Sequence, residues 1–193
     1  LEITPNRGDC LSLKGLARDL NHFYSAKLDQ KIFEDELPDA NLKFENKAEN
    51  LCPNICFVEI EIEGEIKNYA SYLENYFNDL NLNKNNFFTD ISNYLAYESG
   101  QPTHCYDAEK IAGPLVLEKR NKKEEFKTLL GNEIELEGEN LVFTVNGVAV
   151  DLAGTMGDES TSCNEKTSKV LVECAYFKPC LLYTSPSPRD TPI

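Results

Sequence analysis

The sequence has no long apolar run, no excess of basic residues and no methionine at its start. No stretch approaches the roughly 18 to 20 apolar residues that cross a bilayer, and the N-terminus lacks a basic region followed by an apolar one. We therefore expect a cytoplasmic protein that does not bind a membrane. Acidic residues outnumber basic ones 33 to 19, with a net charge of −14. This excludes a free-standing module that holds nucleic acid by phosphate neutralisation alone.

The two ends of the chain suggest a fragment of a longer protein. The chain begins with Leu1, and its only methionine is Met156. Its 193 residues, 41% of them hydrophobic, lie in the ordinary globular range, and we predict a single module over residues 1–180. Proline, serine and threonine dominate the last residues, so residues 181–193 are predicted to form a disordered tail that is foreign to the fold.

The cysteines and the missing motifs argue against a disulfide framework and against a bound cofactor. Seven cysteines are scattered along the chain, which fits reduced thiols. Cys52 and Cys56 have no second pair of cysteines or histidines nearby, whereas tetrahedral zinc requires four such ligands. A Walker-type phosphate loop, a dinucleotide fingerprint and a Gly-x-Ser-x-Gly elbow are all absent. We expect no metal and no cofactor in this chain.

Two stretches carry apolar residues at helical spacing. Residues 10–24 are predicted to form a helix that Asp9 caps and whose apolar stripe packs on a core, despite the helix-weakening Gly15. Residues 68–80 predict a second amphipathic helix. Its tyrosines are more typical of a core face than of an RNA stacking platform, because no lysine or arginine lies between them. Residues 28–55 predict loops with one short strand.

Strand patterns dominate the second half of the chain. Residues 57–63 alternate apolar residues with glutamate, which predicts a strand with one wet face. Residues 141–145 and 148–152 flank Asn146-Gly147, the dipeptide that most strongly predicts a two-residue hairpin turn. Further strands are predicted over residues 115–118 and 169–175.

Two charged clusters have ordinary explanations. The only basic cluster, at residues 119–123, is followed at once by two glutamates, which favours a solvated loop over a phosphate contact. Asp151, Asp158 and Glu159 offer oxygen ligands to a hard cation, but their spacing resembles no calcium loop. Solvent is the expected partner of these carboxylates.

Three polar residues interrupt apolar or glycine-rich surroundings: His104, Asp107 and Glu173. Glycine and proline before His104 predict a turn that holds the imidazole at a rim, where Asp107 could orient it. From the residues alone, His104 is either structural or catalytic. Glu173 is either a solvated edge residue or a buried functional one, because carboxylates are rarely buried without a partner. Cys105 cannot easily share a proton with His104, because adjacent residues of an extended segment point to opposite faces.

Five motifs occur in a specific order: TPNRGDCLSLKGLARDL, NNFFTDISNY, GQPTHCYD, VDLAGTMGD and VLVECAYFKP. Read together, they resemble the β subunit of bacterial phenylalanyl-tRNA synthetase over residues 1 to about 180. The resemblance implies the central third-and-fourth-domain module of that subunit, an α+β fold with mixed and antiparallel sheets around a cleft and helices packed outside. It also implies editing, in which this module hydrolyses tyrosine wrongly esterified to the phenylalanine tRNA.

The resemblance assigns site residues by matched position. The histidine of GQPTHCYD is His104 and the glutamate of VLVECAYFKP is Glu173, and these two are the implied catalytic residues. Glu173 is also implied to bind the tyrosine hydroxyl, with Gly157 and Thr155 of the glycine-rich turn as further substrate-binding residues. His104 either acts as a general base or orients the ribose. Asp158 stands where the family has a second glycine and adds negative charge near the cleft.

The resemblance also implies partners: mischarged tRNA and the synthetase α subunit in an α2β2 assembly. ATP and Mg²⁺ serve the whole enzyme and not this module. The acidic charge agrees with a module that receives only the acceptor end while other parts of the enzyme hold the tRNA. Two alternatives stay open, a non-catalytic structural module of the same subunit and a free-standing aminoacyl-tRNA deacylase.

Overall fold

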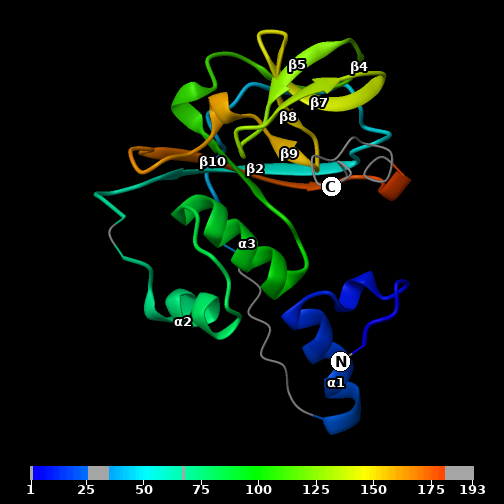
Figure 1. Ribbon diagram of the computed structural model, residues 1–193, viewed down its shortest axis with the longest axis vertical. Helices are drawn as coiled ribbons and strands as arrows, with labels where there is room; N and C mark the ends of the chain where they lie inside the picture. The colour runs from blue at the N-terminus through cyan, green and yellow to red at the C-terminus, as the bar shows by residue number, and fades with distance from the viewer. Residues whose placement is uncertain (1, 26–34, 67, 181–193) are drawn as a thin grey trace. The chain divides into compact units, whose positions relative to one another are not determined.

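A computed structural model of the chain describes residues 2–25, 35–66 and 68–180. It divides into two compact units (Figure 1): unit 1 comprises Leu1–Pro38 and Ile66–Thr103, and unit 2 comprises Asp39–Glu65 and His104–Ile193. Among the described residues, the α-helices lie in unit 1 and the strands in unit 2. The predicted α+β class, with mixed and antiparallel sheets, is confirmed. The boundary of one module at residue 180 stays a prediction, and the predicted tail lies outside the described residues.

Unit 1 begins with the short 3-10 helix η1 (Gly8–Cys10) and helix α1 (Leu13–Tyr24). The predicted helix is confirmed but begins later, because the Ser12 side chain, and not Asp9, caps it by accepting the N–H of Gly15 at 3.0 Å. A Cβ atom on Gly15 would collide with the backbone carbonyl of Asp9. The glycine inside α1 therefore lets the backbone of η1 approach the helix closely.

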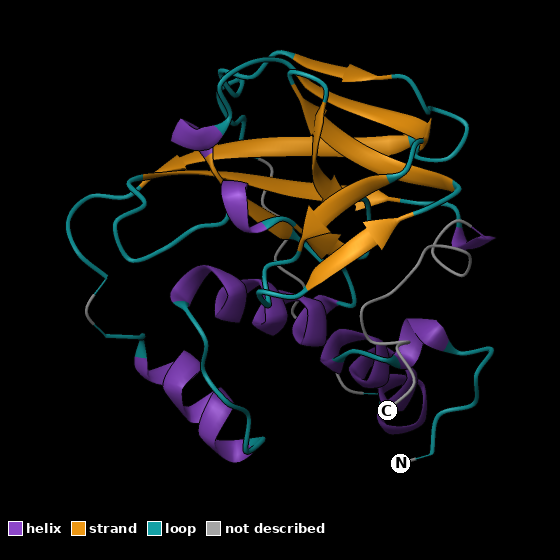
Figure 2. Cartoon of the chain, turned by 45° about the horizontal axis from the view of Figure 1, so that its top comes forward, coloured by secondary structure: helices purple, strands orange, loops and turns teal. Residues whose placement is uncertain are grey.

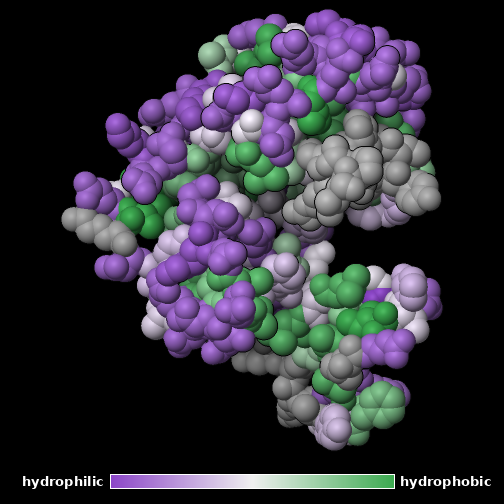
Figure 3. Space-filling view, viewed as in Figure 1, coloured by the Kyte–Doolittle hydropathy of each residue, from purple (hydrophilic) through white to green (hydrophobic). Residues whose placement is uncertain are grey.

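The predicted burial of the α1 stripe is wrong. Leu13 is 62% exposed, Leu20 is 42% exposed and Phe23 is 80% exposed. Figure 3 shows hydrophobic side chains gathered over this part of the chain, at the lower right. Helical spacing specifies which side chains share a face, but it does not specify what covers that face.

Helix α2 (Ser71–Asp79) confirms the predicted helix over residues 68–80. Its buried residues are Leu73 and Phe77, whereas Tyr72 is 58% exposed. The core face of α2 is thus formed by an aliphatic and a phenyl side chain, and the tyrosines flank it.

Helix α3 (Phe87–Ser99) is absent from the sequence predictions. Its ends follow ordinary capping rules: the Asn86 side chain accepts the N–H of Thr89 at 3.0 Å, and Gly100 ends the helix with a φ of 83°. The start and stop residues were therefore visible in the sequence, although the apolar spacing between them is less regular than in α1.

The described residues of unit 2 form three sheets, whose strands are drawn in Figure 2. The five-stranded sheet has the order β1-β4-β7-β8-β9, the three-stranded sheet has the order β2-β10-β3, and β5 pairs with β6. Only β1 and β4 are parallel among the described pairs. The strands are β1 (Phe44–Asn46), β2 (Asn54–Glu61), β3 (His104–Asp107), β4 (Leu115–Asn121), β5 (Glu124–Lys127), β6 (Glu133–Leu136), β7 (Glu139–Val145), β8 (Val148–Leu152), β9 (Met156–Gly157) and β10 (Lys169–Tyr176).

The predicted hairpin is confirmed as β7 and β8. Asn146 has a φ of 50° and Gly147 a φ of 77°, so both turn residues are left-handed, as a type I′ turn requires. Predicted strands also correspond to β2, β4 and β10. The pairs β5–β6 and β8–β9 were not predicted.

The main core of unit 2 lies between the five-stranded and the three-stranded sheet. Leu117 and Phe143 come from the first sheet, and Tyr106 and Leu171 from the second, and all four side chains are almost fully buried. The β5–β6 hairpin covers the other face of the five-stranded sheet through a second cluster that includes Val142. The five-stranded sheet is therefore covered on both faces, which explains why β7 is buried at nearly every position.

The predicted wet face of β2 is wrong. Ile55 and Phe57 pack against the core, whereas Ile60, predicted to be buried, is 44% exposed. Apolar residues occupy both faces of β2, so its alternation alone could not fix the buried face. Pairing decides it, because Phe57 lies opposite Glu173 on the core side of β10.

The basic cluster at residues 119–123 belongs partly to β4 and not to the predicted loop. Lys119 lies 2.7 Å from Glu139, Lys123 lies 2.7 Å from Glu135, and the two basic residues between them also pair with glutamate. These carboxylates disfavour a phosphate contact.

No helix among the described residues is both long and apolar enough to span a membrane.

Candidate functional site

His104, Glu173 and Phe57 form one row across the three-stranded sheet. Strand β10 pairs antiparallel with both neighbours, which places Glu173 directly opposite His104 of β3 on one side and Phe57 of β2 on the other. Directly opposed residues of neighbouring strands point to the same face, and Phe57 packs into the core between the sheets. The structure therefore brings the two predicted catalytic residues together on the core side.

A second row crosses the five-stranded sheet. Phe143 of β7, Asp151 of β8 and Gly157 of β9 lie opposite one another, and Phe143 belongs to the same core. Two contacts join this row to the first: His104 Nε2 lies 3.4 Å from Asp151 Oδ2, and Gly157 packs against the imidazole. The candidate site is thus built from both sheets of unit 2.

Glu173 is the unusual residue of this site. It is 6% exposed, and its carboxyl group has no hydrogen bond or ion pair in the contacts of the described residues. Burial, and to a lesser extent the charge of Asp151, raises the pKa of Glu173 to about 8. The side chain is therefore mainly protonated at neutral pH and offers both an O–H donor and a carbonyl acceptor.

The His104 imidazole is held on several sides. Its ring meets the Tyr106 ring edge-on with centroids 4.4 Å apart. The Tyr106 hydroxyl donates to Asp151 Oδ2 at 3.0 Å, the same oxygen that His104 Nε2 approaches at 3.4 Å. Nε2 is buried and makes no hydrogen bond of good geometry in the described part of the chain. The ring is therefore held by packing, and its contact with Asp151 at 3.4 Å is one of charge and not a hydrogen bond.

Gly157 is required by this packing. A Cβ atom at this position would lie 2.5 Å from His104 Cε1 and 2.8 Å from Nε2, closer than side chains approach one another. The backbone of β9 therefore lies directly on the imidazole. Gly157 therefore lies against His104, whereas its role in substrate binding stays a prediction.

The other predicted residues lie further from the imidazole. Thr155 is half-buried in the turn before β9, where its N–H donates to the carbonyl of Leu152 at 2.9 Å. Asp158 caps the 3-10 helix η3 (Glu159–Thr161) by accepting the N–H of Ser160 at 2.7 Å. No contact among the described residues joins either of them to His104 or Glu173.

Two sequence interpretations are wrong at this site. Asp107 does not orient His104: it accepts a hydrogen bond from Thr167 Oγ1 at 2.8 Å and from the N–H of Glu109. Asp151 is not a solvated carboxylate, because it is 3% exposed. The available signal was that Asp151 interrupts the apolar strand β8 as Glu173 interrupts β10.

The two buried carboxyl groups of the site differ in their surroundings. Burial raises the pKa of Asp151 too, but His104 and the hydrogen bond from Tyr106 oppose this effect. Glu173 has no such partner. Because two nearby buried carboxylates resist being charged together, a single negative charge is more favourable on Asp151 than on Glu173.

A cavity of about 300 Å³ opens elsewhere in unit 2, lined in part by Lys43, Glu59 and Leu171. Glu59 and Leu171 form, with Tyr106, the next row on the same face of the sheet as the row of Glu173. None of the predicted site residues lines this cavity.

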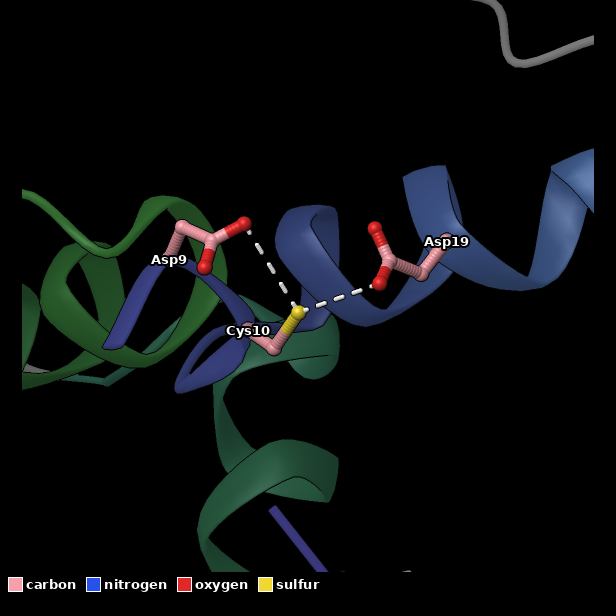
Figure 4. A group of neighbouring side chains, drawn as sticks. All are labelled: Asp9, Cys10 and Asp19. Atoms are coloured by element: carbon pink, nitrogen blue, oxygen red, sulfur yellow. Dashed lines mark hydrogen bonds between the residues drawn. The ribbon is translucent and has the colours of Figure 1, made fainter. Parts of the chain in front are cut away.

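Asp9, Cys10 and Asp19 of unit 1 form the only group of metal-ligand side chains found in the described ranges (Figure 4). Arg7 donates to Asp9 at 3.0 Å and to Asp19 at 2.6 Å, and Arg18 also donates to Asp9. These guanidinium groups already occupy the carboxylate oxygens. The group therefore fits an ion-pair network and not a metal site, and it explains why Asp9 does not cap α1.

The comparisons with known proteins agree with the fold. The chain belongs to the B3/4 domain family, whose model matches residues 51–185. It is similar to the phenylalanine–tRNA ligase β subunits of Carboxydothermus hydrogenoformans and Aquifex aeolicus, each 33% identical, and of Psychrobacter arcticus, 30% identical. Each alignment covers 93% of this chain but 23% of the relative. The resemblance stated from the motifs is thus confirmed.

A solved structure shows the same fold. It is an N-terminal fragment of the phenylalanyl-tRNA synthetase β subunit from Pyrococcus horikoshii, with a TM-score of 0.54 and 15% identity. The match covers 90% of this chain and 54% of that fragment. At this identity the likeness concerns the fold alone.

Proposed function

We propose that this chain is the editing segment of a phenylalanine–tRNA ligase β subunit, and that it hydrolyses the ester of tyrosine wrongly attached to the phenylalanine tRNA. The relatives that cover nearly the whole chain are such β subunits. The chain spans only 23% of their length, so aminoacylation, the α subunit and most of the tRNA contact belong elsewhere in the assembly. ATP and Mg²⁺ serve that separate reaction.

A second site is needed for a physical reason. Tyrosine is phenylalanine with one added hydroxyl, and an apolar pocket rejects such an isostere by only about a hundredfold. A site that forms a hydrogen bond with the hydroxyl reverses the preference, because phenylalanine leaves the buried polar group unpaired. Such a site holds tyrosine long enough for hydrolysis and releases phenylalanine intact.

The buried and unpartnered Glu173 is the observation that carries this proposal. A carboxyl group at 6% exposure costs free energy unless it is hydrogen-bonded, and the phenol of tyrosine supplies the missing partner. The protonated form expected at neutral pH accepts the phenol O–H on its carbonyl oxygen. The bond then contributes about 0.5–1.5 kcal/mol, or about 1.5–3 kcal/mol if the carboxyl group ionises when tyrosine binds.

The chemistry asked of His104 is modest. An aminoacyl ester is already activated, so placing a water against its carbonyl supplies much of the rate. The imidazole accepts a proton from that water, the hydroxide forms a bond to the carbonyl carbon, and the bond to the ribose oxygen breaks. The proton then passes to the ribose oxygen, and no covalent enzyme intermediate is required.

The test is a pair of substitutions at Glu173 in the complete ligase, with deacylation of tyrosyl and phenylalanyl esters of the same tRNA measured side by side. Glu173→Ala should lower the preference for the tyrosyl ester about tenfold, which corresponds to about 1.4 kcal/mol. Glu173→Gln keeps a hydrogen-bonding group and should retain part of the preference. Glu165→Ala, at an exposed glutamate of the loop before β10, is the matched control.

Two results would contradict the proposal. If the unmodified ligase leaves the tyrosyl ester intact, the segment is a structural module. If Glu173→Ala hydrolyses both esters with unchanged preference, Glu173 does not recognise the hydroxyl.

A further inference from the structure

Asp151 reaches the site through an irregularity in its strand. The pairing of β7 with β8 is Phe143 with Asp151 and then Thr144 with Ala149, so Val150 is an extra residue in a β-bulge. Bulges occur next to active sites, where they redirect a side chain. Without the bulge, Asp151 would lie opposite Val142 and face the second core cluster. With it, Asp151 lies opposite Phe143 and faces His104.

Burying a charged carboxylate costs free energy, so the position of Asp151 requires an explanation. Asp151 is 3% exposed, and its Oδ2 atom lies 3.0 Å from the Tyr106 hydroxyl and 3.4 Å from His104 Nε2. Tyr106 is completely buried and donates no other hydrogen bond in the described contacts. Its hydroxyl therefore fixes the carboxylate, and the carboxylate in turn faces one nitrogen of the imidazole.

We propose that Asp151 is a positioning residue that holds His104 in the tautomer with the proton on Nε2, so that Nδ1 accepts the proton of the attacking water. This inference rests on the proposed editing function. A carboxylate 3.4 Å from Nε2 favours a proton on that nitrogen by charge, and the lone pair then lies on Nδ1. When Nδ1 accepts the water proton, the imidazolium that forms is stabilised by the charge of Asp151.

The residues around the imidazole support a proton on Nε2 and a free lone pair on Nδ1. Gly157 packs on the Cε1–Nε2 edge and Tyr106 meets the ring edge-on, so the Nε2 side is closed by protein. The remaining nearby carboxyl group, Glu173, is mainly protonated and recognises substrate in the proposed function. Asp151 is thus the charged group that sets the tautomer, and Glu173 is the neutral group that selects the ester.

The first test measures the tautomer directly and needs no activity. The chain has two histidines, so nitrogen-15 NMR of the labelled chain resolves His104 beside the exposed His22 as an internal reference. We expect the proton on Nε2 in the unmodified chain. In Asp151→Asn the amide N–H can face the ring, and the population should move toward the Nδ1–H tautomer. An unchanged tautomer would overturn the inference.

The second test measures hydrolysis of the tyrosyl ester by the complete ligase. Asp151→Asn should lower kcat about a hundredfold, within the range that general base catalysis supplies, and should leave KM and the preference for the tyrosyl ester unchanged. Asp158→Asn is the matched control, because it removes a neighbouring carboxylate and still caps η3. It should retain kcat.

Tyr106→Phe provides a variant that keeps the charge of Asp151 but removes the hydroxyl that fixes it. We expect kcat to fall by about threefold to tenfold, as for the loss of one hydrogen bond. Normal kcat in both Asp151→Asn and Tyr106→Phe, alongside lost preference in Glu173→Ala, would reject the role of Asp151 and leave the editing function standing. No hydrolysis by the unmodified ligase would instead reject the editing function.

Discussion

Asp90 of unit 1 and Glu173 of unit 2 are both buried carboxyl groups, but they differ in their hydrogen bonds. In unit 1, Asp90 is fully buried, and it accepts a hydrogen bond from the Tyr69 hydroxyl at 2.5 Å and from the N–H of Asn85 at 3.1 Å. In unit 2, Glu173 is nearly as buried and has no such donor in the described contacts. A buried carboxyl group with hydrogen-bond donors stabilises a fold, whereas a buried carboxyl group without them is typical of a functional site.

The apolar side chains show the reverse contrast. Phe143 of unit 2 is fully buried between two sheets, whereas Phe23 of unit 1 is 80% exposed on α1. Unit 2 therefore has an apolar core large enough to hold one polar group without a partner. Unit 1 relies more on capping, ion pairs and hydrogen bonds. The candidate site lies in the unit with the larger apolar core, which can tolerate the cost of an unpaired carboxyl group.

The largest expected effect tests the difference in burial between apolar side chains of the two units. Phe143→Ala should lower the free energy of unfolding of unit 2 by about 3–5 kcal/mol, because it opens a cavity in a closed core. Phe23→Ala, the same change on α1, should alter stability by less than about 0.5 kcal/mol. Urea denaturation of both variants measures the difference. Equal losses would show that α1 packs against a core after all.

An effect of similar size is the pH dependence that Glu173 imposes on unit 2. Its pKa rises from 4.5 to about 8 because burial disfavours the charged form. The folded state then binds more protons than the unfolded state between these two values. Stability should therefore fall as the pH rises through this range, by about 1.4 kcal/mol per pH unit, and level off above pH 8.

Glu173→Gln removes this titration and should flatten the profile, whereas Glu165→Gln, at an exposed glutamate, should not. Urea unfolding at a series of pH values measures all three proteins. A profile of the unmodified chain that is already flat would show that Glu173 has a partner in solution.

The smallest expected effect concerns Asp90, the buried and hydrogen-bonded carboxyl group of unit 1. Tyr69→Phe removes the hydroxyl that donates to Asp90 and should cost about 1.5–3 kcal/mol, the usual range for a hydrogen bond to a charged group. Tyr72→Phe on α2 removes a hydroxyl from a side chain that is 58% exposed and should cost almost nothing. Thermal unfolding of the two variants distinguishes them, and equal melting temperatures would contradict the contrast between the units.

Much of the local structure could be predicted because it depends on neighbours in the chain. The turn at Asn146-Gly147 follows from two residues that adopt positive φ easily, and α2 follows from its apolar spacing. Helix α3 was missed although Asn86 and Gly100 mark its ends, because its apolar residues do not form a regular stripe. The strands β5 and β9 are too short for alternation to show.

The site could be predicted only in part. The motifs pointed to His104, Gly157 and Glu173 through resemblance, and the structure brings these three residues into one region. Tyr106 carries no local sign of its role, and the only local sign of Asp151 is that it interrupts the apolar strand β8. The bulge at Val150 that directs Asp151 toward His104 depends on pairing with β7 and not on the residues of β8 alone.

By itself, the sequence determined helices α1 and α2, the hairpin of β7 and β8 and several of the longer strands, since propensity, capping and turn geometry act over a few residues. The tertiary structure decided which face of β2 is buried, whether the α1 stripe is covered, and which buried carboxyl groups have partners. These outcomes depend on contacts between segments far apart in the chain, and their energies come from burial and pairing that no local pattern contains.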